Sequence, residues 1–171
     1  MDFYRELETS LAKSNSTQRH SWAATIIAQD ISIRELTPLL KGNAQTCSRF
    51  LWLLSDVGIA NPEKLMSELP YLFELFSTEF PQYLPSFASF WYYTGVPNEN
   101  EGAAIDLLFE LFLSTDTTVT IKSRALVVLA GLAEKYPALK PELCSCIDAQ
   151  ADKHSADFQK RADRIRRTLT D

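Results

Sequence analysis

The string LFELF occurs twice in this chain, and this internal repetition constrains the fold more than any other feature of the sequence. The two copies, at residues 72–76 and 108–112, begin 36 positions apart. A similar apolar pattern, LCSCI at residues 143–147, begins 35 positions after the second copy. Self-similarity with a period of roughly 20 to 50 residues predicts a stacked array of one supersecondary unit rather than a single globule.

A second series with the same period is interleaved with the first. It begins at Ser48, Ser86, Ser123 and Lys160, which are 38, 37 and 37 positions apart, and a shorter first copy begins at Ser21. Around Ser123, apolar residues recur with the 3.6-residue period of an α-helix. These residues are Ile121, Ala125, Val128, Leu129, Leu132 and Ala133. The two series therefore predict the first and second helices of repeated helical hairpins.

Turn-forming residues divide the chain into ten expected helices in five pairs. We expect the glycines to provide left-handed helix C-caps and the prolines to begin the next helices. The interrupting residues are Gly42, Gly58 with Pro62, Gly95 with Pro97, and Pro137. The expected helix pairs span residues 2–13 and 16–29, 32–41 and 43–58, 62–78 and 81–95, 99–114 and 117–135, and 137–152 and 155–170.

The composition is that of one ordinary globular domain covering residues 1–171. Hydrophobic residues make up 46% of the chain and charged residues 23%, which is usual for a folded domain. A chain of this length buries roughly 70% of its unfolded surface, so it needs neither a disulfide nor a structural metal. No apolar run approaches the ~20 residues of a membrane span, and the N-terminal segment lacks the apolar core of a signal peptide. We therefore expect a cytoplasmic protein without membrane association, either a monomer or a weak homodimer.

The fourth copy resembles the HEAT-repeat family. A leucine-rich first helix at residues 107–113 is followed by Asp116 in the turn, and residues 121–125 and 128–133 form a second helix that contains Arg and Ala. The resemblance implies an all-α, right-handed α-α superhelix of about five HEAT-like hairpins, whose second helices line a concave surface used by scaffolds and adaptors. Armadillo-like and irregular α-α superhelices remain open as alternatives. The five repeats are expected at residues 1–29, 30–58, 61–95, 98–135 and 136–171.

Aligning the second helices identifies the positions beside the core stripe, where the copies should differ according to the partner. In the fourth copy these positions are Thr120, Arg124 and Val127. The equivalent positions in the other copies predict a concave wall that changes from aromatic to basic along the chain. The candidate partner-binding residues are Trp22, Arg49, Trp52, Tyr83, Phe87, Phe90, Arg124, Arg161 and Arg164.

The third copy is unusual because residues 80–98 contain seven aromatic side chains and no charged one. Four residues align with the core stripe, namely Leu84, Ala88, Trp91 and Tyr92. This leaves Tyr83, Phe87 and Phe90 on a second helical face. Exposed aromatic clusters often mark interaction sites, so partner recognition is one interpretation. The alternatives are that neighbouring repeats cover both faces, or that the face forms a homodimer seam.

The last expected helix is basic although the chain carries a net charge of −5. Cations at a helix C-terminus are favoured by the helix dipole, so this pattern has a purely structural explanation. Its functional interpretation is a docking patch for an acidic peptide or a phosphate. The basic residues are Lys160, Arg161, Arg164, Arg166 and Arg167.

The sequence contains no recognisable catalytic, metal or cofactor motif, so we expect a non-enzymatic protein that binds another protein or peptide without a cofactor. The two histidines, His20 and His154, fall in the first and last repeats. Cys144 and Cys146 point to different helix faces, which does not suit shared metal ligation.

One alternative is nucleic-acid binding. Trp52 and Asp56, with Arg124 and Arg164 on later helices, resemble the Trp, Asp and Arg set in the groove of HEAT-like alkylpurine DNA glycosylases. Those enzymes are basic, whereas this chain has an isoelectric point near 5.1. Because phosphate neutralisation supplies most of the affinity for DNA, the acidic composition favours a protein partner.

Overall fold

The computed structural model describes residues 2–171, apart from the side chain of residue 151, and every regular element in this range is helical. The α-helices are α1 (Phe3–Ser10), α2 (Ser16–Ala28), α3 (Ala44–Ala60), α4 (Pro62–Met66), α5 (Leu69–Glu79), α6 (Phe87–Thr94), α7 (Glu101–Leu113), α8 (Val119–Lys135), α9 (Lys140–Gln150) and α10 (Ala156–Thr170). Short 3₁₀ helices complete the chain: η1 (Leu11–Lys13), η2 (Ile33–Lys41), η3 (Pro81–Ser86), η4 (Asn98–Asn100), η5 (Pro137–Leu139) and η6 (Ala151–Lys153). The all-α class is confirmed, while several of the expected helices differ in type or extent.

Local capping explains why the second helix of most pairs begins where it does. Asn15 and Gln18 form a reciprocal capping box at the start of α2. The Asn43 side chain accepts a hydrogen bond from the Thr46 backbone at the start of α3, at 2.8 Å. Thr118 caps α8 and Ser155 caps α10 in the same way. Each cap satisfies a backbone N–H that has no partner within the helix.

Prolines account for the main departures from the expected helices. Residues 33–41 form a 3₁₀ helix rather than an α-helix, and Pro38 within it lacks the N–H that an α-helix interior needs. The expected helix over 62–78 is divided into α4 and α5, where Pro70 occupies the first turn of α5. Residues 81–86 form η3, with Pro85 inside it, before α6 begins.

Glycine behaves as expected at only one of the helix ends considered. Gly95, after α6, has φ +87°, a conformation that side chains with a Cβ rarely adopt. Gly42 has a φ of −74°, so its expected left-handed cap is wrong. The expected stop at Gly58 is also wrong, because α3 continues to Ala60 and Gly58 is buried within it. An ideal Cβ at Gly58 would lie 2.7 Å from Cδ2 of Leu65, so close packing against α4 explains this glycine.

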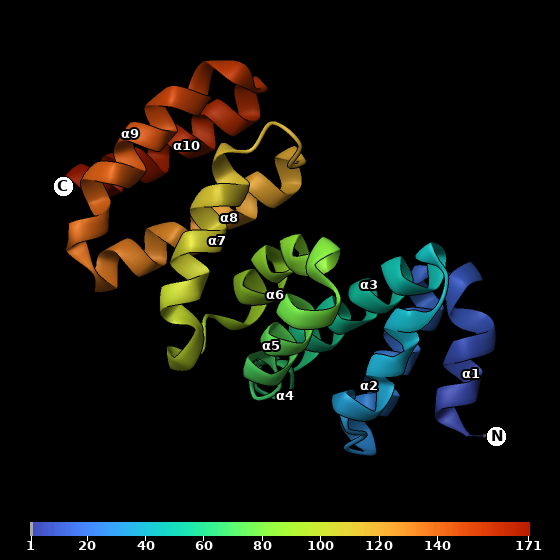
Figure 1. Cartoon of the computed structure of the whole chain (residues 1–171). Coiled ribbons are helices and arrows are strands. Elements are labelled where there is room, and N and C mark those ends of the chain that lie inside the picture. Colours follow the sequence, from blue (N-terminus) through green and yellow to red (C-terminus); the bar gives the residue numbers. More distant parts are fainter. Residues whose placement is uncertain (1) are drawn as a thin grey trace.

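The helices that the sequence predicts to be second in each pair, α2, α3, α6, α8 and α10, form a continuous series, and they are called the second helices below. In this series α2 contacts α3, α3 contacts α6, α6 contacts α8, and α8 contacts α10. Figure 1 shows the helices following one another along an elongated molecule, with the two termini at opposite ends. Residues about one repeat apart in the sequence therefore meet on neighbouring second helices.

The aromatic residues of the third repeat are mostly core residues. Phe87 and Phe90 are fully buried, so the expectation that they lie on an exposed second face is wrong. Phe73 and Phe76 of α5 lie with ring centroids 5.1 and 5.2 Å from that of Phe87, in edge-to-face geometry. The other side of α6 contacts α3 and α8. Neighbouring helices thus cover both faces, while Tyr92, which the alignment placed in the core, is 43% exposed.

No helix among residues 2–171 combines the length and the apolar character that crossing a membrane requires.

Candidate functional site

The second helices enclose a cavity of about 420 Å³, called here the inner cavity. Its charged and aromatic lining residues come from four elements: Arg19 and His20 from α2, Trp52 and Asp56 from α3, Tyr93 from α6, and Arg124 from α8. Hydroxyl groups from Ser16, Ser55, Ser86, Ser89, Thr118 and Thr120 complete the polar part of the lining. A cavity with a few convergent polar groups and exposed aromatic surface is the usual form of a binding site.

Trp52 is an exposed aromatic residue of the lining, with 49% of its surface accessible. The guanidinium of Arg49, three residues earlier on α3, lies 4.3 Å from the centre of the Trp52 ring. The guanidinium of Arg19, from α2, lies 5.1 Å from it. Arg19 is itself held by hydrogen bonds from Nη1 to the backbone oxygen of Ser14 at 2.8 Å and to its hydroxyl at 3.2 Å. Two cation–π contacts therefore fix the orientation of Trp52.

Arg124 joins α8 to α6 across the inner cavity. Its Nη1 donates a hydrogen bond to the Ser89 hydroxyl at 2.8 Å. Its guanidinium carbon also lies 5.2 Å from the Tyr93 ring centre and 5.8 Å from that of Tyr92. These contacts leave Arg124 half-buried and oriented before any ligand arrives.

Asp56 is the only acidic residue in the lining, and it pairs with His20. The Oδ1 of Asp56 lies 3.5 Å from Nε2 of His20. Burial raises the pKa of the Asp56 carboxyl, while the charges of His20 and Arg19 and the hydrogen bond from His20 act in the opposite direction. The cavity therefore has positive character, with one partly desolvated carboxylate among its cations.

The pair of His20 and Asp56 does not form a nucleophilic triad. Within residues 2–171, no hydrogen bond joins His20 to either of the lining hydroxyls of Ser16 or Ser55. Hydroxyl attack requires such a contact between the nucleophile and its base. In the same range, no three His, Cys, Asp or Glu side chains gather as metal ligands.

The residues that the alignment placed on one partner-binding wall lie on separate parts of the structure. Trp52 and Arg124 line the inner cavity, and Arg49 contacts Trp52 from beside it. Arg161 and Arg164 are exposed on α10 and do not belong to the lining.

The aromatic members of the expected wall lie elsewhere. Trp22 is only 7% exposed, and its Nε1 donates a hydrogen bond to Glu6 at 3.1 Å, so its expected place on the partner-binding face is wrong. Phe87 and Phe90 belong to the core, and Tyr83 is half-buried on η3. The aromatic part of the candidate surface is therefore formed by Trp52, with Tyr93 beside Arg124.

Sequence reasoning missed Arg19, His20, Ser89 and Tyr93 as lining residues. For Ser89 the spacing held a partial signal, because Ser89 and Arg124 are 35 positions apart, close to the 37 positions between the third and fourth copies. His20 and Asp56 are 36 positions apart, whereas the first and second copies begin 27 apart, so the repeat spacing gave no signal for this contact.

A scan against models of known protein families finds no match to this chain, and searches of characterised proteins and of solved structures find none either.

Proposed function

We propose that this protein is a non-enzymatic scaffold or adaptor that binds another protein at the inner cavity. On this proposal the chain is a right-handed, HEAT-like α-α superhelix, and its second helices form the concave binding face. The observation that carries the proposal is the exposed Trp52, held by Arg19 and Arg49 in a cavity to which four successive second-helix segments contribute. Aromatic and arginine side chains fixed in a pocket are the usual anchors of protein interfaces.

The lining supports binding better than catalysis. Its one carboxylate lies 3.5 Å from His20, and among residues 2–171 His20 forms no hydrogen bond with a hydroxyl group of the lining. The rigid stacking of Arg19 and Arg49 on Trp52 lowers the conformational entropy lost when a partner binds. A preorganised surface of this kind favours recognition of a macromolecule.

Site-specific photocrosslinking in a cell extract tests this proposal. Ile59 lines the cavity and is 56% exposed, whereas Leu113 is 43% exposed on α7 and lies outside the lining. A photoreactive residue at position 59 should capture one defined protein, and the same residue at position 113 should not. A Trp52→Ala variant should lose the crosslink at position 59, while Tyr136→Ala, which removes an exposed aromatic residue outside the lining, should retain it. Equal crosslinking at 59 and 113, or capture that is unaffected by Trp52→Ala, would contradict the proposal.

Nucleic-acid binding is the second candidate, because Trp52, Asp56 and Arg124 all line the same cavity. This is the part of the chain that resembles the alkylpurine DNA glycosylases. An electrophoretic shift assay with duplex DNA at low salt tests it. Retardation that falls steeply with salt and is lost in Arg124→Gln would favour this function, and no retardation would eliminate it.

A further inference from the structure

The arginines around the inner cavity lack acidic partners. Four arginines of residues 2–171 are wholly or partly shielded from solvent, namely Arg19, Arg49, Arg124 and Arg166. Arg166 is neutralised by Asp148, whose two carboxylate oxygens accept hydrogen bonds from it at 2.6 and 2.9 Å. Within this range the other three form no salt bridge, and all three lie in or beside the inner cavity.

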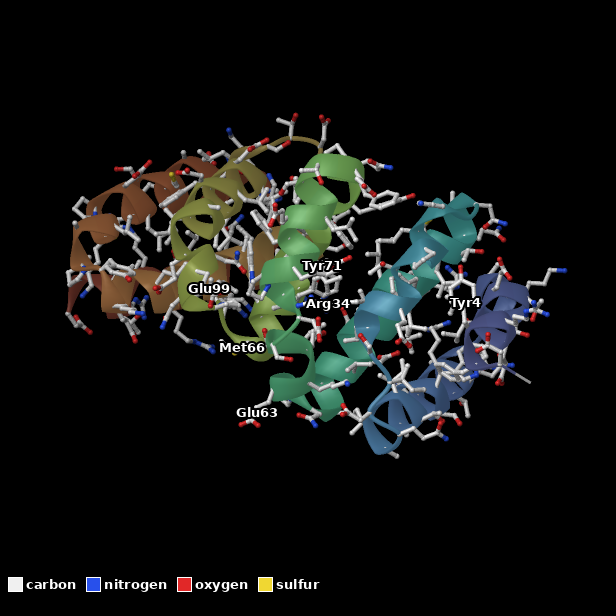
Figure 2. All side chains as sticks on the ribbon, turned by 60° about the horizontal axis from the view of Figure 1, so that its bottom comes forward. Tyr4, Arg34, Glu63, Met66, Tyr71 and Glu99 are labelled. Carbon is white, nitrogen blue, oxygen red and sulfur yellow. The ribbon has the colours of Figure 1, made fainter. Side chains whose placement is uncertain are left out.

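On other surfaces of the molecule, several cations do have acidic partners. Figure 2 shows Arg34 beside Tyr71, and its guanidinium lies 4.4 Å from that ring centre. Unlike the cavity arginines, Arg34 also has an acidic partner, because its Nε donates to Glu68 at 2.9 Å. Lys64 and Lys135 likewise pair with Asp30 and Glu101. Away from the inner cavity, the cations that stack on aromatic rings, Arg34 and Lys135, also form ion pairs. Within residues 2–171, the stacked arginines around the inner cavity form none.

Shielding a guanidinium without a counter-charge is unfavourable, because the group loses hydration that an aromatic ring only partly replaces. The cavity arginines also retain unused hydrogen-bond donors. Arg124 donates to Ser89 alone, and the Nε of Arg49 is buried without any acceptor. The single carboxylate of Asp56 cannot balance three arginines. The charge of Arg19 acts on it, but within residues 2–171 Asp56 forms no salt bridge with any of the three. The cavity thus holds positive charge in a chain whose net charge is −5.

We propose that the inner cavity binds an acidic segment of a partner protein. Aspartate or glutamate carboxylates of that segment pair with Arg19 and Arg124, while an adjacent side chain packs on the exposed part of Trp52. This inference rests on the proposed function, because it specifies the chemistry of the partner at the same site. A planar guanidinium can bind a carboxylate through two parallel hydrogen bonds, which gives the contact directional specificity.

A carboxylate-bearing protein segment suits the cavity better than a nucleic acid. Within residues 2–171, the shielded arginines that form no salt bridge are confined to one cavity, whereas a duplex requires a basic surface that follows its phosphates. A short acidic segment can place its carboxylates on these arginines without a continuous basic surface.

The test uses the full chain and two synthetic peptides of equal length. One consists of Glu–Ala repeats with a central leucine, and the other has glutamine at every glutamate position. Binding is measured by fluorescence anisotropy of a label on the peptide and by intrinsic tryptophan emission. Trp22 and Trp91 are buried and Trp52 is exposed, so a change in the emission on binding reports on the cavity.

We expect the acidic peptide to bind at least about tenfold more tightly than the glutamine peptide and to change the Trp52 emission. Arg124→Gln should weaken binding by at least about tenfold, the effect expected for loss of one desolvated charge pair. Arg5→Gln is the matched control, because it removes the same charge from the exposed surface of α1, and it should change affinity less than about twofold. Arg124→Lys, which keeps the charge, should retain part of the affinity and shows whether the effect follows charge or folding.

Three results would overturn this inference. They are equal binding of the two peptides, equal losses in Arg124→Gln and Arg5→Gln, and tighter binding of a duplex DNA than of the acidic peptide. The first two results would contradict only this inference if Trp52→Ala still abolished the crosslink at position 59. If Trp52→Ala left that crosslink unchanged, the proposed function itself would be contradicted.

Discussion

Lys122 Nζ lies 3.5 Å from His154 Nε2, although both groups can carry a positive charge. Lys122 is only 3% exposed, and it donates a hydrogen bond to Gln150 Oε1 at 3.2 Å. Burial lowers the pKa of His154, and the charges of Lys122 and Lys153 lower it further. His154 also packs on Phe158, at 4.7 Å between ring centres. The turn that joins α9 to α10 is therefore built around an imidazole that is favoured in its neutral form.

This arrangement predicts that mild acid destabilises the last helical pair. In the unfolded chain His154 takes up a proton near its ordinary pKa of 6.5, whereas in the folded chain its pKa is lower. The unfolded state therefore binds more protons below pH 6.5, and the free energy of unfolding should fall as the pH decreases through this value. Urea unfolding at about pH 7.5 and about pH 5.5 measures this fall.

The control for this prediction separates His154 from the acidic groups. His154→Gln should flatten the pH dependence in this interval. The paired carboxylates Glu101 and Asp148 have lowered pKa values. Their stabilising effect is lost only as the pH falls below their ordinary values of 4.5 and 3.8, outside the interval. An unchanged pH dependence in His154→Gln would contradict the prediction.

A second pH effect concerns Asp56 in the inner cavity. Burial raises the pKa of this carboxyl above its ordinary 3.8, so its ionised form destabilises the folded state at neutral pH. We expect Asp56→Asn to increase the free energy of unfolding at pH 7, and this gain should shrink as the pH falls toward the ordinary carboxyl pKa. Urea unfolding as a function of pH measures both. A loss of stability at pH 7 would show that the contact with His20 outweighs the cost of burying Asp56.

The central apolar stripe of α8 should carry much of the stability of the chain. Leu129 is 1% exposed and belongs to the main core. Leu129→Ala should lower the free energy of unfolding by about 2 to 5 kcal/mol, because it leaves a cavity that the neighbours cannot fill completely. Arg166→Ala removes only an exposed ion pair with Asp148 and should change stability little. Similar losses in the two variants in chemical denaturation would contradict this account.

Hydrogen exchange should distinguish a stacked array from a cooperative bundle. In a repeat array each pair depends on its neighbours, so the end pairs can open before the centre. The amides of α6 and α8 should therefore exchange most slowly, with protection decreasing toward α1 and α10. Native-state exchange followed by mass spectrometry or NMR measures this order. Uniform protection across the helices would contradict the repeat interpretation and, with it, the proposed concave surface.

Replacing two exposed glycines, Gly95 and Gly131, with alanine should change the stability of the fold in opposite directions. Gly95 has φ +87°, so Gly95→Ala should cost about 1 to 3 kcal/mol although no atom would obstruct the new Cβ. Gly131 lies inside α8, also with open space around it, and Gly131→Ala should stabilise the chain by roughly 0.5 to 1 kcal/mol. Thermal unfolding of the two variants measures the signs, and equal effects would contradict the conformational explanation.

The helices could be read from the sequence because their signals are local. A side chain such as Asn43 or Thr118 caps the helix that follows it, and apolar residues recur with a period of 3.6. The boundary between α4 and α5 near Pro70 was harder to predict, because a proline can either begin a helix or end one. Trp52 and Arg124 could also be selected as site residues from their positions in the repeat.

Only the tertiary structure decided which aromatic residues are exposed. The alignment treated residues 81–95 as one α-helix, but residues 81–86 form a 3₁₀ helix with about 3.0 residues per turn. Within α6, Ala88 and Trp91 are buried as the alignment expected, but Phe87 and Phe90 are buried too, because aromatic rings of α5 pack on Phe87. Tyr92, which the alignment placed in the core, is exposed. The contacts of Arg124 with Ser89 and of His20 with Asp56 also arose only when neighbouring repeats stacked. Periodicity identifies the buried face of one helix, whereas exposure of its other faces depends on how many neighbours pack against it.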